Sequence, residues 1–180
     1  MDTEKLKKIQ SQMGALVSSK ESIILASVGD DGTPHASYAP TVTGEGGKYY
    51  IHISELAKHY HNLSANGKVS ALLIEDEKDA ANIFARKRLT LEGKAVEVNK
   101  DTSLWSEVMG RFAAKFGDFF EQSLKNLKDF HTYELSFENG TLVMGFGAAY
   151  RLTGDELGKI DWLKGAHGTE GAGLAHTDAR

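Results

Sequence analysis

The sequence predicts an antiparallel β-barrel with helices on its outside, an α+β fold of about seven strands. Three observations lead to this fold class. Short apolar segments, several of them rich in β-branched residues, recur along the chain. Turn signals, among them Asp31-Gly32 and Asn139-Gly140, follow or separate these segments. Few segments carry apolar residues at helical spacing, so strands joined by hairpins dominate and a barrel is favoured.

A first helix is predicted at residues 3–18, where apolar residues recur every three or four positions between Lys and Gln. A second helix is predicted at residues 54–66, because the Ser54 hydroxyl can cap its first turn. A third helix covers residues 101–127. Two glycines in this third helix predict a kink or a division into two shorter helices, namely Gly110 and Gly117.

The predicted strands are short apolar or alternating segments, and the last two flank Asn139-Gly140 as a hairpin. They cover residues 22–28, 35–43, 48–53, 69–75, 86–98, 131–137 and 141–146. The apolar pattern ends after Leu152. We therefore expect one barrel domain at residues 1–163, followed by a Gly-rich C-terminal tail at residues 164–180.

The composition excludes several classes of function. The net charge is −4 and the pI about 6.0, so there is no basic excess for binding nucleic acid or an anionic membrane. The chain has no cysteine, which excludes disulfides, thiolate-bound metals and cysteine nucleophiles. It shows neither an export signal nor an apolar stretch of membrane-spanning length, and we expect a cytoplasmic protein.

The seven histidines are the main chemical resource of the sequence. His59 and His61 lie two residues apart on a predicted helix, so they face different directions and do not ligate one metal together. His52 on the preceding strand could join one of them, although a structural role is the simpler interpretation. His167 lies in Gly165-Ala166-His167-Gly168, where the glycines allow close approach to a flat surface, and it is a candidate axial ligand of haem iron.

Other motifs are weak or missing. The chain has no P-loop and no GxSxG nucleophile motif. The two glycines Gly145 and Gly147 lack the third glycine and the helix of a dinucleotide site, which predicts a bend at a strand end.

Residues 25–40 (LASVGDDGTPHASYAP) resemble the opening hairpin of the FMN-binding split-barrel, or pyridoxamine-phosphate-oxidase-like, superfamily. Residues 50–58, Asn62-Leu63 and residues 69–74 continue this resemblance. Within the superfamily the chain is most similar to the HugZ/HutZ family of bacterial haem-utilisation proteins. The motifs that indicate this family are GFGAAY at residues 145–150 and GAHG at residues 165–168. The resemblance extends from about residue 6 to residue 170.

This resemblance implies a homodimer of split barrels that binds haem at the subunit interface and degrades it oxidatively. It implies His167 as the axial iron ligand. It also implies that Asp129 of the partner subunit is the carboxylate that accepts a hydrogen bond from that histidine. It also implies an arginine near the opposite face of the haem, with Arg88 as first choice and Arg86 as second. Haem is then both cofactor and substrate.

The chemistry of haem agrees with these residues. Haem is an apolar plane with two carboxylates, so it needs an apolar slot with positive charges at the rim. Such charges could come from Lys58, Arg86, Lys87 and Arg88, which could equally be ordinary surface residues. An arginine can hydrogen-bond dioxygen on the open side of the haem. Electrons must come from an external donor, because no flavin or nicotinamide motif is evident.

Two other functions remain open at this stage. A haem carrier or storage protein would use the same site without turnover. An FMN-dependent oxidase or reductase would have the same fold. Flavin-binding relatives hold the FMN phosphate with basic and hydroxyl residues on the third strand and the next helix. This chain has Ser54 and Lys58 there, but His59 and His61 occupy the same helix, and we do not expect strong FMN binding.

Overall fold

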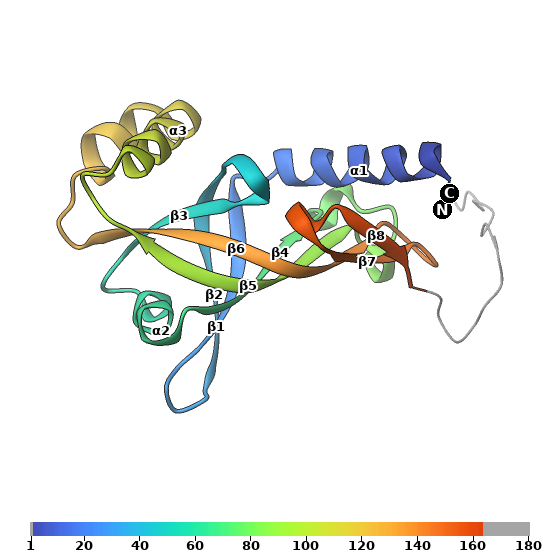
Figure 1. The fold of residues 1–180 in the computed structure, drawn as a ribbon, viewed down its shortest axis with the longest axis horizontal. Helices are drawn as coiled ribbons and strands as arrows, with labels where there is room; N and C mark the ends of the chain where they lie inside the picture. Colours follow the sequence, from blue (N-terminus) through green and yellow to red (C-terminus); the bar gives the residue numbers. More distant parts are fainter. Residues whose placement is uncertain (1, 164–180) are drawn as a thin grey trace.

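The computed structural model describes residues 2–163 as a closed antiparallel barrel with three helices around it and two more strands beside it (Figure 1). The helices are α1 (Thr3–Ser18), α2 (Lys58–Asn66) and α3 (Ser103–Phe119). The strands are β1 (Ser22–Val28), β2 (Pro34–Thr43), β3 (Tyr49–Ser54), β4 (Lys68–Ile74), β5 (Arg88–Val98), β6 (Phe130–Val143), β7 (Ala149–Thr153) and β8 (Lys159–Trp162). The predicted fold class is confirmed.

The barrel closes through β3, which pairs with β2 on one side and with β6 on the other. Six strands in the order β3-β2-β1-β4-β5-β6 therefore form a ring without an open edge. β6 is long enough to serve two neighbours. Its first residues, Phe130 to Leu135, pair with β3, and its last residues, Gly140 to Val143, pair with β7. The β7–β8 hairpin thus extends the sheet beyond the barrel.

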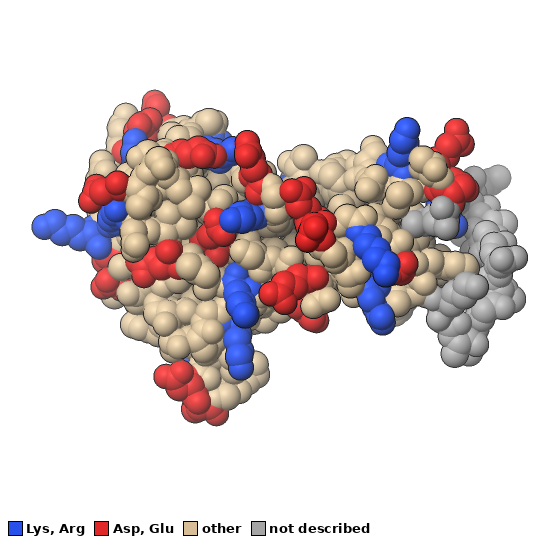
Figure 2. All heavy atoms as spheres, viewed as in Figure 1, with Lys and Arg blue, Asp and Glu red and all other residues tan. Residues whose placement is uncertain are grey.

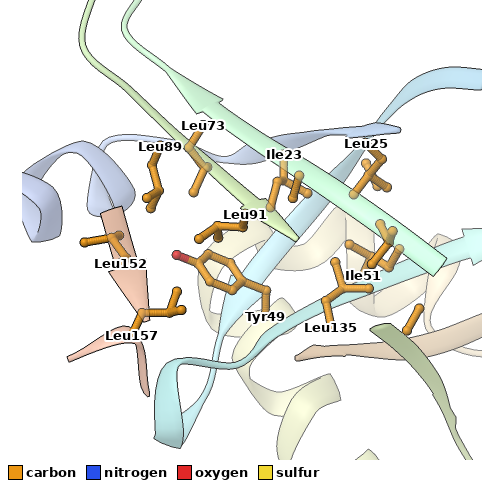
Figure 3. Packing of buried hydrophobic residues seen from close by; sticks show 14 of the residues in the cluster. Ile23, Leu25, Tyr49, Ile51, Leu73, Leu89, Leu91, Leu135, Leu152 and Leu157 are labelled. Atoms are coloured by element: carbon orange, nitrogen blue, oxygen red, sulfur yellow. The ribbon is translucent and has the colours of Figure 1, made fainter. Parts of the chain in front are cut away.

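Large apolar side chains fill the barrel interior, pointing inward at alternate positions of the strands (Figure 3). Ile23, Ile51, Leu91 and Leu135 are completely buried there. α1 adds Ile9 to the same cluster from outside the strands. Burying a side chain of this size contributes about 1.5–3 kcal/mol, so this interior holds the strands in one arrangement.

α3 packs on the outside of the barrel through a second apolar cluster. The buried members of this cluster come from β2, β3, the end of β5 and α3 with the turn after it: Val42, Tyr50, Val98, Val108, Met109, Phe112 and Phe120. The predicted kink is confirmed at Gly117, which has φ 67° and ψ −155°, and one π-helical turn at Phe120–Leu124 follows it. Gly110 remains helical.

The hairpin predicted at Asn139-Gly140 is wrong, because β6 runs through both residues without a turn. Asn139 pairs with Glu92, and Gly140 pairs with Leu91 on β5 and with Leu152 on β7. Gly140 is small for a packing reason: a Cβ there would lie 3.0 Å from the Leu91 Cδ2 atom. Pairing with strands on both sides therefore outweighs the local turn preference.

Two further sequence predictions need correction. The apolar pattern was expected to end after Leu152, but β7 ends and β8 begins beyond that residue. β8 is held there by Ile160, which pairs with Leu152 and is buried. Ser54 does not cap α2, which begins at Lys58 after Ala57 and has no side-chain cap. None of the helices within residues 2–163 has the length and apolar character needed to cross a membrane.

Candidate functional site

Asp129 lies in the loop just before β6 and is held by the end of β3. Ser54 is opposite Phe130 in the β3–β6 pairing, so its side chain reaches the loop. The Ser54 hydroxyl donates to Asp129 Oδ2 at 2.8 Å, and the Glu55 backbone N–H donates to the Asp129 carbonyl at 2.8 Å. No donor within residues 2–163 bonds the other carboxylate oxygen, Oδ1.

Lys58 and an exposed leucine follow Ser54, the residue that holds Asp129, closely in the sequence. Lys58 is the exposed first residue of α2, four residues after Ser54. Its charge reaches the β1–β2 loop, where hydrogen bonds from Thr33 and then the Lys58 charge lower the pKa of Asp31. Leu56 is 92% exposed, although it is a large apolar side chain. This end of the barrel therefore presents a fixed carboxylate, a cation and an apolar surface.

The two arginines at the start of β5 differ in their partners. Arg86 donates to the Glu75 carbonyl and pairs with the Glu77 carboxylate at 3.2 Å, so it holds the connection between β4 and β5 together. Arg88 is half-buried and donates to the Arg86 carbonyl at 3.1 Å. No carboxylate of residues 2–163 forms an ion pair with Arg88. Arg88 is therefore better suited than Arg86 to bind an incoming ligand.

Exposed aromatic and aliphatic side chains surround the same end of the sheet. Ile83 and Phe84 precede β5 and are 54% and 84% exposed, and Phe146 in the turn after β6 is 61% exposed. These segments share one end of the sheet because Arg88 pairs with Val143. The sequence reasoning did not select Ile83 and Phe84, although an apolar pair in the polar stretch between two strands was a usable signal. The predicted bend at Gly145 and Gly147 is confirmed, with φ of 143° and 66°.

The histidines in the described part of the chain do not form a metal site. His52 is buried against Phe112, Phe120 and Phe130, and its Nδ1 lies 3.0 Å from the Thr132 hydroxyl. Burial lowers the pKa of His52 to about 4, which keeps its ring neutral.

His59 is also buried, and burial followed by the charge of His35 lowers its pKa. His61 is exposed on α2, as expected from its spacing to His59. No cluster of three metal-ligating side chains occurs within residues 2–163. A structural role for His52 agrees with its contacts, and His52 does not join His59 or His61 in a metal cluster.

The structure places the two parts of the predicted site at opposite ends of one sheet. Arg88 pairs with Val143, whereas Asp129 precedes Phe130 at the other end of the same strand. Their separation along β6 is on the order of 40 Å, far more than the width of a haem. One protomer therefore brings Asp129, Ser54 and Lys58 to one end and Arg86 and Arg88 to the other. The predicted axial ligand, His167, lies outside the described residues.

An apolar surface lies next to Arg88 on the outside of the barrel. Ile24 is opposite Tyr38 on β2 and opposite Leu72 on β4, and their side chains point outward. Ile24 is 43% exposed and Tyr38 69% exposed. Arg88 pairs with Ile74, two residues along β4 from Leu72, so it borders this surface. Exposed apolar side chains that lie together in this way mark a candidate contact surface.

Comparison with known proteins gives consistent matches. The pyridoxamine 5'-phosphate oxidase family matches residues 9–144. A protein named haem oxygenase HutZ, from Vibrio cholerae serotype O1, is 40% identical over 148 residues, which are 82% of this chain and 83% of the relative.

Solved structures give the same picture. HutZ from Vibrio cholerae, there called a haem storage protein, has a TM-score of 0.72 and 34% identity. The match covers 76% of this chain and 96% of that one. ChuZ from Campylobacter jejuni has a TM-score of 0.78 and 28% identity, and the match covers 87% of this chain and 63% of that one.

Proposed function

This chain belongs to the pyridoxamine 5'-phosphate oxidase family, in its HugZ/HutZ branch of haem-utilisation proteins, and from this premise we propose that it binds haem and degrades it oxidatively with release of iron. The observation that carries the proposal is the end of the sheet around Arg88. An arginine without a carboxylate partner among residues 2–163 lies there beside exposed Ile83, Phe84 and Phe146. A cation at the rim of an apolar surface fits a flat apolar ligand that carries carboxylates.

The site is proposed to be completed by a second copy of the chain. Asp129 and Arg88 lie too far apart in one protomer to contact the same haem. In a two-fold dimer, each protomer gives the same surface to its partner, so opposite ends of the two sheets can meet. The exposed apolar surface of Ile24 and Tyr38 beside Arg88 supports such a contact. Each haem would then lie between Asp129 of one protomer and Arg88 and His167 of the other.

The residues of this chain have distinct tasks in that site. His167 would provide the imidazole for the iron, and Asp129 would accept the other ring N–H, which would fix the tautomer and make the imidazole a stronger donor. Ser54 keeps the carboxylate pointing one way by its 2.8 Å hydrogen bond. The guanidinium of Arg88 would be available to donate a hydrogen bond to dioxygen when haem is bound. Bound haem supplies the iron that activates dioxygen and the ring carbon that is oxidised, and an external donor supplies the electrons.

Haem storage is the second candidate function, because one solved relative is called a haem storage protein. Storage needs the apolar surface and His167, but no donor toward dioxygen. An FMN-dependent oxidase or reductase is the third candidate. It is less well supported, because the Ser54 hydroxyl that would bind a phosphate already donates to Asp129.

Degradation and storage are separated by one assay on the haem complex. The complex is mixed with reductant in air, and the Soret absorbance and the iron captured by a chelator are followed together. We expect loss of the Soret band with release of iron. Asp129→Asn should retain haem but turn over about 10- to 100-fold more slowly, since it loses the charged acceptor for the imidazole.

Glu92→Gln is the matched control for this assay, because it also removes one carboxylate charge and Glu92 has an exposed side chain in the middle of β5. It should degrade haem at the wild-type rate. A Soret band that stays constant in the wild type, with no iron released, would establish storage and contradict degradation.

A further inference from the structure

A histidine between two carboxylates lies two residues after Asp129. His131 Nδ1 is 2.6 Å from Glu97 Oε1, and His131 Nε2 is 2.8 Å from Glu55 Oε1. A carboxylate oxygen can only accept, so both ring nitrogens must donate, and the ring is an imidazolium. The Tyr60 ring lies against it with a centroid distance of 4.7 Å. The geometry thus assigns His131 a positive charge.

The electrostatics agree with this charge. Burial alone would lower the pKa of His131, but its hydrogen bonds to Glu97 and Glu55 and their negative charges outweigh burial. The pKa of His131 is therefore raised above its ordinary value of 6.5.

Glu55 connects His131 to Asp129. Its side chain accepts from the His131 ring, and its backbone N–H donates to the Asp129 carbonyl at 2.8 Å. The neighbouring Ser54 holds the Asp129 carboxylate. The turn after β3 therefore fixes Asp129, and the ring of His131 fixes that turn from the other side.

Loss of the proton from His131 leaves one donor for two carboxylates. Glu97 lies within β5, where its backbone pairs with Tyr133, so it has little freedom to move. The side chains of Glu55 and Glu97 are similarly exposed, at 48% and 45%, but Glu55 follows the end of β3 and lies in a turn, so it is the partner that can leave. The turn that holds Asp129 then loses its support.

Two other titratable groups near the ring have pKa values shifted away from the range of His131. Buried His52 on β3 is neutral, with its pKa lowered to about 4. Burial raises the pKa of Tyr133, which follows in β6 and bonds Ser64. The ring of Tyr60 on α2 lies against the His131 ring at an interplanar angle of 40°. Neither His52 nor Tyr133 therefore changes charge in the range where His131 does.

We propose that His131 is a positioning residue for Asp129: as an imidazolium between Glu55 and Glu97 it fixes the turn after β3 that orients the Asp129 carboxylate, and its deprotonation frees that turn. The effect on catalysis rests on the proposed function, in which Asp129 orients the axial histidine. Deprotonation of His131 then slows haem degradation as the pH rises. This direction follows from the charge, since the bridging state is the protonated one.

The first test uses the full-length protein without haem, labelled for NMR. The His131 ring, the Asp129 carboxyl carbon and the Glu55 amide are followed as the pH is raised. We expect all three signals to change with one midpoint, which lies above the ordinary histidine pKa of 6.5.

Two variants sharpen this measurement. Glu97→Gln removes one negative charge and supplies an amide that neutral His131 can accept from, so the common midpoint should fall by about one pH unit or more. Glu92→Gln removes the same charge at an exposed position elsewhere on β5 and should leave the midpoint unchanged. Asp129 and Glu55 signals that stay constant while His131 titrates would overturn the proposal.

The second test measures haem degradation against pH in the wild type and in Glu97→Gln. The rate should fall with the His131 midpoint of each protein. A rate of haem degradation that does not change around the His131 midpoint measured by NMR would contradict the proposed effect on catalysis. A wild-type protein that never degrades haem would instead contradict the proposed function, and the NMR result would still decide whether His131 positions Asp129.

Discussion

Ser54 and Asp129 show what a single residue's role owes to the fold. They are 75 positions apart and meet only because β3 pairs with β6. Asp129 was predicted from the family resemblance, and Ser54 was predicted to cap a helix. The contact between Ser54 and Asp129 was not predictable, because no local pattern encodes a pairing between distant strands. The same holds for His131, whose two carboxylates come from a turn and from another strand.

His52 gives a prediction at the residue scale. Its pKa is lowered from 6.5 to about 4, so the unfolded chain binds a proton that the folded chain does not take up between these values. The contribution of this pKa difference to stability is fully present above pH 6.5 and is lost as the pH falls toward 4. We expect the free energy of unfolding to fall by about 3 kcal/mol between pH 7 and pH 4 for this reason.

Denaturant unfolding at several pH values measures this cost. The difference in stability between wild type and His52→Gln should shrink by about 3 kcal/mol from pH 7 to pH 4. His61→Gln is the control, because His61 is exposed, and it should follow the wild type at every pH. Parallel curves for wild type and His52→Gln would show that burial of His52 does not disfavour its charged form.

At the scale of elements, local patterns predicted most of the structure. The helix at residues 3–18, the kink in the third helix and the first five strands follow from periodicity and glycine placement. Predictions failed where pairing with neighbouring strands determines the structure. Asn139-Gly140 lies inside β6, and β8 forms from a short segment whose backbone is satisfied by β7.

Substituting two glycines by alanine separates the effect of packing on stability from the effect of helix propensity. Gly140→Ala places a methyl group 3.0 Å from Leu91 and 3.1 Å from the Thr90 carbonyl, and we expect a loss of about 1–3 kcal/mol in the free energy of unfolding. Gly110→Ala adds a methyl group inside α3 with no atom within 4 Å, and should gain about 0.5–1 kcal/mol. Chemical denaturation measures both. Equal effects of the two variants would contradict a packing role for Gly140.

For the whole molecule, composition predicted the surface well. Acidic and basic side chains are interspersed over the face seen in Figure 2, as a net charge of −4 suggests. Closure of the barrel was inferred only as a class, because the β3–β6 contact that closes it joins distant parts of the chain. The separation of Asp129 and Arg88 at opposite ends of β6 could likewise not be predicted from the sequence, because it depends on the register between β5 and β6.

That separation leads to the proposal that each haem site combines residues of two protomers. Mixed dimers test it most directly. A His167→Ala chain and an Asp129→Ala chain are co-expressed with different tags, and the mixed dimer is purified and assayed for haem loss with reductant and dioxygen. Each variant alone should be inactive or nearly so.

In a shared site, one pocket of the mixed dimer carries both substitutions and the other carries neither. A shared site therefore predicts recovery of up to half of the wild-type turnover per dimer. If His167 and Asp129 act within one chain, every pocket carries one substitution, and the mixed dimer stays as inactive as its parents. That result would contradict a site shared between protomers.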